Sequence, residues 1–161
     1  MSLSRLTEFL DYNQIKYVVI SHSVAYTAAG IAALTHIPGQ ELAKTVMVKL
    51  DGQLAMAVVS ASQHVDLAAL KAATAAKTVM LASENDFRDK FPDCETGAMP
   101  PFGNLYGVNV FVDEILSHDE EIAFNAGSHR KLVRLSWKDY VNLVQPKVMK
   151  LAAVRHAVQA A

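Results

Sequence analysis

The sequence has one cysteine, one tryptophan and no excess of charge of either sign. With Cys94 alone, an internal disulfide is impossible, which is typical of proteins in a reducing compartment, so we expect a cytoplasmic location. A formal net charge of −1 excludes a protein that coats nucleic acid over a wide surface, because such proteins need a basic excess. A small basic patch that touches a few phosphates is compatible with this balance.

Long apolar segments are also missing. No run reaches the roughly 18 residues of a membrane span, and residues 1–5 lack the apolar core of a signal peptide. We therefore expect neither a membrane partner nor a leader. The 161 residues are 52% hydrophobic, which excludes a disordered chain and predicts one globular domain with a substantial core.

Signatures of common catalytic centres are lacking as well. The six histidines form no i, i+4 pair with a glutamate base, and there is no cysteine pair, so we expect no metal and no other cofactor. Neither Gly-x-Ser-x-Gly nor Gly-x-x-x-x-Gly-Lys occurs, which argues against a serine-hydrolase elbow and a phosphate-binding loop. Cys94 is left as a candidate nucleophile with His129 as its base, against the alternative of a small buried hydrophobe.

Apolar periodicity and turn residues predict a mixed α/β domain. Asp51-Gly52 separates two β-rich runs, 45–50 and 53–59, and predicts a two-residue hairpin. Both runs are almost continuously apolar, which favours central strands covered on both faces. The other predicted elements are helices over 3–12, 28–34, 67–75, 84–90 and 137–144, a helical turn at 114–116, and strands over 17–20, 78–81, 109–113, 121–125 and 131–135. Residues 146–161, with Val148, Leu151, Ala152 and Val154, favour a docked or frayed helix.

One stretch is neither helix nor strand. It reads Gly97-Ala98-Met99-Pro100-Pro101-Phe102-Gly103. A proline pair is incompatible with a central strand and with a helix interior, so this is a stiff loop with a flexible glycine at each end. Glycines let backbone N–H groups come close to a neighbour, which is either the protein's own core or a substrate.

Three polar groups accompany this loop. Lys44 precedes the hairpin, and is either a substrate-facing cation or a lysine that snorkels at a sheet end. Residues 125–129 place small residues and donors at a strand end, as a binding loop or a simple β-turn would. A basic cluster follows, available for phosphate contacts or merely solvated: Arg130, Lys131, Arg134 and Lys138.

Taken together, these motifs resemble a known family. The segments 43–46 (Ala-Lys-Thr-Val), 97–103, 112–113 (Val-Asp) and 125–129 (Asn-Ala-Gly-Ser-His) occur in this order. They resemble the YbaK family, the free-standing relatives of the editing domain inserted in bacterial prolyl-tRNA synthetase. The resemblance covers residues 3–144. It implies a single α+β domain over 1–145, built on a mostly antiparallel barrel-like sheet with surrounding helices, and a tail over 146–161.

The resemblance also implies an activity, hydrolysis of the ester of a mischarged aminoacyl-tRNA. Lys44 corresponds to the family's key lysine and is the predicted catalytic residue. The predicted substrate-binding residues are Tyr26, Thr27, Gly97, Ala98, Met99, Pro100, Pro101, Phe102, Gly103, Asn125, Gly127, Ser128 and His129. The expected partners are the 3′ end of aminoacyl-tRNA and an aminoacyl-tRNA synthetase. Many relatives have Thr-Gly where this chain has Phe-Pro-Asp-Cys at 91–94, so the pocket rim is expected to differ.

Two alternatives stay open. One is a non-catalytic module that binds a tRNA end or a synthetase with the same fold. The other is a hydrolase that depends on Cys94. The sequence does not choose among cysteine, alanine, serine and threonine as the amino acid removed, and it does not give the oligomeric state.

Overall fold

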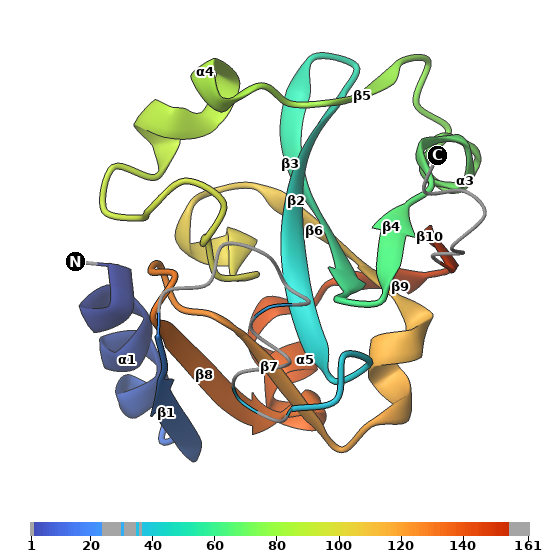
Figure 1. Cartoon of the computed structure of the whole chain (residues 1–161). Coiled ribbons are helices and arrows are strands. Elements are labelled where there is room, and N and C mark those ends of the chain that lie inside the picture. The colour runs from blue at the N-terminus through green and yellow to red at the C-terminus, as the bar shows by residue number, and fades with distance from the viewer. Residues whose placement is uncertain (1, 24–29, 31–34, 36, 155–161) are drawn as a thin grey trace.

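A central hairpin organises the sheet (Figure 1). In the computed structural model, which describes residues 2–23, 30, 35 and 37–154, β2 (Leu42–Leu50) runs antiparallel to β3 (Gln53–Ser60). Asp51 (φ 50°) and Gly52 (φ 84°) both have positive φ, as the predicted Asp-Gly turn requires. The last six residues of β3 are buried, which confirms the prediction of a strand covered on both faces.

In the described part of the chain, seven strands, including the two of the hairpin, lie side by side in the order β1-β8-β7-β2-β3-β6-β9. A further strand of the same sheet, β5, also pairs with β2. Their bounds are β1 (Tyr17–Ser21), β5 (Val79–Leu81), β6 (Asn109–Asp113), β7 (Glu121–Asn125), β8 (Lys131–Ser136) and β9 (Lys147–Met149). Most pairings are antiparallel, but β2–β7, β3–β6 and β6–β9 are parallel. A separate antiparallel pair joins β4 (Gln63–Val65) to β10 (Ala152–Val154).

Helices surround the sheet at positions that their capping residues predict. They are α1 (Ser2–Tyr12), α3 (Leu67–Thr74), α4 (Glu84–Phe87) and α5 (Trp137–Val144), with short 3-10 helices η1 (Arg88–Lys90), η2 (Gly103–Leu105) and η3 (Glu114–His118). Asp66, Ser83 and Ser136 each accept a hydrogen bond from a first-turn amide of the helix that follows. The helix predicted over 28–34 lies outside the described residues, apart from residue 30.

The largest core cluster fills the space between α1, α5 and one face of the sheet. Phe102 is fully buried at its centre, with ring centroids 6.2 Å from Phe9, 5.4 Å from Phe124 and 5.5 Å from Tyr140. Pairs at these separations add to the stabilisation that burial provides. The loop that contains Phe102 is thus part of the interior.

The C-terminal stretch differs from its prediction. Where a helix was expected over 146–161, the described part forms β9, which pairs with β6, and β10, which pairs with β4. The buried carboxylate of Asp113 explains the geometry, because its Oδ1 accepts hydrogen bonds from the amides of Leu151 (2.9 Å) and Ala152 (3.1 Å). These bonds hold the extended chain against the end of β6, so residues 147–154 complete the domain instead of trailing from it.

Candidate active site

The edge of β2 is shared by two strands that do not meet. β7 pairs with Leu42 and Ala43, whereas β5 pairs with residues 48–50. Among the described strands, none pairs with the stretch between them on this edge. In Figure 1, β5 lies at the hairpin end of β2 and β7 at the other end. Two of the predicted site residues, Lys44 and Asn125, lie at the start of this interval.

Lys44 is the first residue of β2 beyond its pairing with β7. It lies within the strand, opposite Val59 of β3, and not at the entry of the hairpin as its sequence position suggested. Its side chain is half-buried. A lysine in the middle of a paired strand is held by its backbone, which suits a positioning role.

Asn125 lies beside Lys44. The parallel register pairs Ala43 with Phe124, so the next residues along the two strands, Lys44 and Asn125, point to the same face. The Oδ1 atom of Asn125 is buried and accepts no hydrogen bond from the described residues. A cation and an amide therefore stand together at the start of the unpaired interval.

The 97–103 loop and the 127–129 turn are joined by hydrogen bonds. The Gly127 amide donates to the Ala98 carbonyl (2.8 Å), and the Glu95 amide donates to the Gly127 carbonyl (2.8 Å). The His129 ring Nε2 is 2.8 Å from the Thr96 carbonyl; a carbonyl only accepts, so Nε2 carries the proton. Two groups that are about 30 residues apart thus form one rigid unit.

Most of the loop is anchored in the core. Ala98, Met99 and Phe102 are buried, and the Tyr140 hydroxyl donates to the Pro101 carbonyl (2.8 Å). Burial raises the pKa of Tyr140 well above its ordinary value, so this hydroxyl keeps its proton as a donor. Gly97, with φ +83°, is the exposed end of the loop. A substrate would therefore meet the loop first at this glycine.

Backbone donors at the site divide into used and unused ones. The Ala98 amide donates to the Glu95 carbonyl (3.0 Å), and the Gly127 amide is occupied as described above. Within the described part of the chain, the amides of Gly97 and Met99 donate no hydrogen bond. The Gly127 N–H is thus already used, whereas the N–H of Gly97 can turn toward a ligand.

Cys94 lies three residues before Gly97, and its Sγ is 3.5 Å from the Tyr106 hydroxyl. Burial is the main cause that raises the pKa of Tyr106, followed by this hydrogen bond with Cys94. The described contact of Cys94 is with a tyrosine, and that of the His129 ring is with the Thr96 carbonyl. The nucleophile hypothesis stays a prediction with no support from these contacts.

The structure adds Thr96 to the candidate site, a residue that the sequence did not single out, and it does not describe two of the predicted substrate-binding residues. Thr96 links the site to α4, because its hydroxyl donates to Glu84 Oε1 (3.3 Å) and its carbonyl holds His129. No local signal identifies it, since both partners are distant in sequence. The predicted substrate-binding residues Tyr26 and Thr27 lie outside the described residues.

Two members of the predicted basic cluster contact residues of other strands. Lys131 donates to the Ser21 hydroxyl (2.6 Å), and Arg134 Nε lies 3.8 Å from Glu121.

Over the described ranges, no group of three or more His, Cys, Asp or Glu residues is arranged to hold a metal ion. None of the helices in the described part is long and apolar enough to cross a membrane.

Known proteins resemble this chain over most of its length. The profile of the aminoacyl-tRNA editing domain family matches residues 22–143. The chain is 28% identical, over 150 residues, to the multifunctional Ser/Thr-tRNA deacylase ProXp-y of Escherichia coli K12, and the match covers 90% of this chain and 89% of that protein.

Two solved structures share the fold. The crystal structure of hypothetical protein APE2540 has a TM-score of 0.83 at 19% identity, over 92% of this chain and 99% of that one. A candidate trans-editing enzyme for prolyl-tRNA synthetase has a TM-score of 0.80 at 21% identity, over 94% and 97%.

Proposed function

Because the chain belongs to the aminoacyl-tRNA editing domain family, we propose that it removes serine or threonine from mischarged tRNA, with Lys44 positioning the ester. Membership confirms the predicted fold class and the predicted activity, hydrolysis of the ester bond of mischarged aminoacyl-tRNA. The observation that supports the residue assignment is that Lys44 and Asn125 share one face at the start of the unpaired edge of β2, and that Gly127, two residues after Asn125, is hydrogen-bonded to the 97–103 loop.

The reaction needs no nucleophile from the protein. Water attacks the ester carbonyl carbon, the bond from that carbon to the ribose oxygen breaks, and free amino acid and a tRNA with a free hydroxyl result. The adjacent ribose hydroxyl or a second water takes the proton of the attacking water and passes a proton on to the departing ribose oxygen. Lys44 binds the terminal phosphate or polarises the carbonyl, and its fixed place in a paired strand favours positioning.

Charge develops on the carbonyl oxygen as the tetrahedral intermediate forms. The Gly97 amide, which donates no hydrogen bond to the described residues, supports a role as its donor. One preorganised donor of this kind is worth about a hundred- to a thousandfold in rate. The bonds from Gly127 to Ala98 and from His129 to Thr96 hold that amide in place.

Serine and threonine are favoured by two considerations. The curated relative is named for those two amino acids. The candidate site is also polar, since Asn125 Oδ1 has no partner among the described residues and Ser128 keeps its own hydroxyl proton while accepting from the Arg130 amide (3.0 Å). A site that hydrogen-bonds a substrate hydroxyl discriminates strongly against an analogue that lacks it, so alanyl-tRNA should be a poor substrate.

A panel of tRNAs mischarged with serine, threonine, alanine and cysteine tests the proposal. We expect wild type to release serine and threonine fastest. Lys44→Ala should keep the fold, measured by circular dichroism, and lose at least about a hundredfold in kcat/KM, because the ester is no longer aligned. Lys71→Ala on the exposed surface of α3 is the matched control and should retain full activity.

Two results would contradict these assignments. Full activity in Lys44→Ala removes the lysine from the mechanism. Binding without hydrolysis of any charged tRNA favours the non-catalytic module. Cys94→Ser belongs in the same assay, because full activity of that variant eliminates the cysteine-dependent hydrolase.

The cellular setting follows from the substrate. We place the protein in the cytoplasm, where tRNA is charged. Association with an aminoacyl-tRNA synthetase is supported by the description of one structural neighbour as a candidate trans-editing enzyme for prolyl-tRNA synthetase. Co-purification with prolyl-tRNA synthetase in the presence and absence of tRNA tests whether the two proteins meet directly.

A further inference from the structure

A polar hollow of about 500 Å³ lies at the hairpin end of β2, separate from the site residues. Two lysines line it, and we call it the Lys49–Lys90 groove; its other walls are Gly52, Gln53, Leu54, Asp86, Gly107, Val108 and Asn109. A neighbouring hollow of about 300 Å³ shares residues 107–109 and adds Lys147. The lining is mainly amide, ammonium and backbone, which suits a charged polar ligand better than an apolar one.

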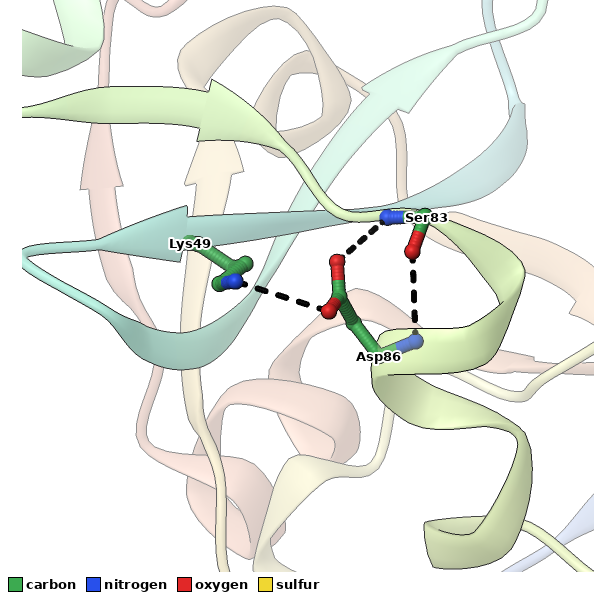
Figure 2. Close-up of polar contacts among 3 residues, drawn as sticks. All are labelled: Lys49, Ser83 and Asp86. Carbon is green, nitrogen blue, oxygen red and sulfur yellow. Dashed lines mark hydrogen bonds and ion pairs between the residues drawn. The ribbon is translucent and has the colours of Figure 1, made fainter.

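Lys49 is held in a defined position. Its Nζ lies 3.4 Å from Asp86 Oδ1, and Asp86 Oδ2 accepts a hydrogen bond from the Ser83 amide (2.8 Å), as Figure 2 shows. The bonds from Ser83, first the amide and then the hydroxyl, lower the pKa of Asp86, so the carboxylate stays charged. The lysine side chain keeps 28% of its surface exposed, which leaves the ammonium accessible from the groove.

The groove is connected to the active site through α4 and η1. Thr96, next to Gly97, donates to Glu84 at the start of α4. Arg88 lines a small cavity together with Thr96, and Lys90, two residues further along η1, lines the groove. Three cations therefore lead away from the site: Arg88, Lys90 and Lys49.

Lys44 and Lys49 are five residues apart on β2, about 16 Å along the strand, and this odd separation places their side chains on opposite faces of the sheet. The path from the site to the groove therefore runs through α4 and η1 and not along one face of β2. Carboxylates near the path are Glu84, Asp86 and Asp89; Glu84 accepts from Thr96, and Asp86 is committed to Lys49 and Ser83.

We propose that the Lys49–Lys90 groove binds the phosphate backbone of the tRNA acceptor arm while the 3′ end occupies the site at Lys44. This inference rests on the proposed function. It assigns the phosphate contacts to α4, η1 and the hairpin and not to the 130–138 cluster, none of whose residues lines the groove. Phosphate contacts of this kind raise affinity for any tRNA without reading its sequence.

The test compares Lys49→Gln/Lys90→Gln with the charge-matched control Lys16→Gln/Lys71→Gln. Binding of a pool of unacylated tRNA is measured against salt concentration, and hydrolysis is measured on mischarged tRNA and on a minimal aminoacyl-adenosine ester. We expect the groove variant to bind tRNA about tenfold more weakly. The slope of the logarithm of its binding constant against the logarithm of salt concentration should be smaller in magnitude by about two, one for each lysine removed. KM for mischarged tRNA should rise by a similar factor, with kcat and the minimal ester unaffected.

Each outcome decides the proposal. Equal tRNA affinity in the groove variant and the control overturns it, as does loss of activity on the minimal ester, which would indicate a damaged site. Lys49→Arg/Lys90→Arg should restore wild-type affinity, since charge is retained, and failure to do so also counts against it. If wild type binds tRNA through the groove but hydrolyses no ester, the groove stands and the proposed function fails.

Discussion

At the scale of single residues, Gly103 shows how closely the loop is packed. A Cβ atom at this position would lie 2.3 Å from the Val108 carbonyl oxygen and 2.6 Å from a methyl of Val110. The first of these neighbours is backbone and cannot rotate away. The absence of a side chain at Gly103 is therefore what allows the 97–103 loop to close against the start of β6.

Gly103→Ala should consequently lower the free energy of unfolding by about 3 kcal/mol, because the clash must be relieved by moving backbone. Urea denaturation measures this loss. Gly107→Ala is the matched control: nothing lies within 4 Å of its Cβ position, so its cost comes only from φ +69° and should be about 1 kcal/mol. Equal losses in the two variants would show that steric contact at Gly103 is unimportant.

At the scale of elements, one carboxylate attaches the last strands to the sheet. Asp113 ends β6, and besides Leu151 and Ala152 its carboxylate accepts from the Ile115 amide (3.1 Å) at the start of η3. Its exposed fraction is 2%, so removing the side chain would leave buried N–H groups without an acceptor. The connection between β9 and β10 is thus held by a single side chain, in addition to the pairing of these strands with β6 and β4.

Asp113→Ala should destabilise the protein by about 3 kcal/mol, at roughly 1 kcal/mol for each hydrogen bond lost. Hydrogen exchange should locate the effect, with the largest loss of protection at the amides of Leu151 and Ala152. Asp66→Ala, which removes the cap of α3 alone, should cost about 1 kcal/mol and leave those amides protected. Unchanged protection in Asp113→Ala would contradict the attachment.

The elements that the sequence predicted correctly are those with local signals. The Asp51-Gly52 turn and the bounds of α5 are set by neighbours within a few residues, and both were predicted correctly. β9 and β10 were missed because each is three residues long and pairs with strands distant in sequence. Apolar residues at 148, 151, 152 and 154 imitate helical spacing, whereas the pairing with β6 and β4 and the contact with Asp113 favour the extended chain.

The candidate site was predicted by motif and not by geometry. The sequence identified the 97–103 loop and the 127–129 turn, but the bonds that join them involve Thr96 and Glu95, which carry no pattern of their own. Likewise, the stiffness expected from the proline pair is reinforced by Tyr140, whose hydroxyl reaches Pro101 across 39 residues of sequence. Such long-range contacts cannot be read from spacing.

At the scale of the whole molecule, the beginning of β2 carries an unfavourable group of charges. Desolvation is the main cause that raises the pKa of Glu41, and the carboxylates of Glu121 and Asp119 raise it further, against a lowering effect of Arg134. The folded state therefore disfavours the charged form of Glu41. The charged Glu41 therefore lowers the free energy of unfolding. This loss is fully present when the pH is above the pKa of Glu41 in the folded state, and it disappears when the pH is below the pKa of Glu41 in the unfolded state.

Glu41→Gln should accordingly stabilise the protein by roughly a few tenths of a kcal/mol near neutral pH, since the side chain is partly exposed and solvent screens the effect. At about pH 3, where the carboxyl is protonated in both states, the variant and wild type should have equal stability. Thermal unfolding at the two pH values measures the difference. Glu8→Gln on the exposed surface of α1 is the control, and an equal gain there would make the effect a general one of net charge.

The attachment of the last strands also bears on the order in which the molecule is made. Every candidate site residue from Lys44 to His129 is synthesised before residues 147–154, yet β6 obtains its second neighbour, and Asp113 two of its three amide donors, only from those residues. The sheet can therefore be completed only when translation of the chain is nearly finished. During synthesis, the nascent chain holds all the site residues while Asp113 still lacks two of its three donors, and quality-control proteases would encounter an unfinished edge at β6 until the final strands pair.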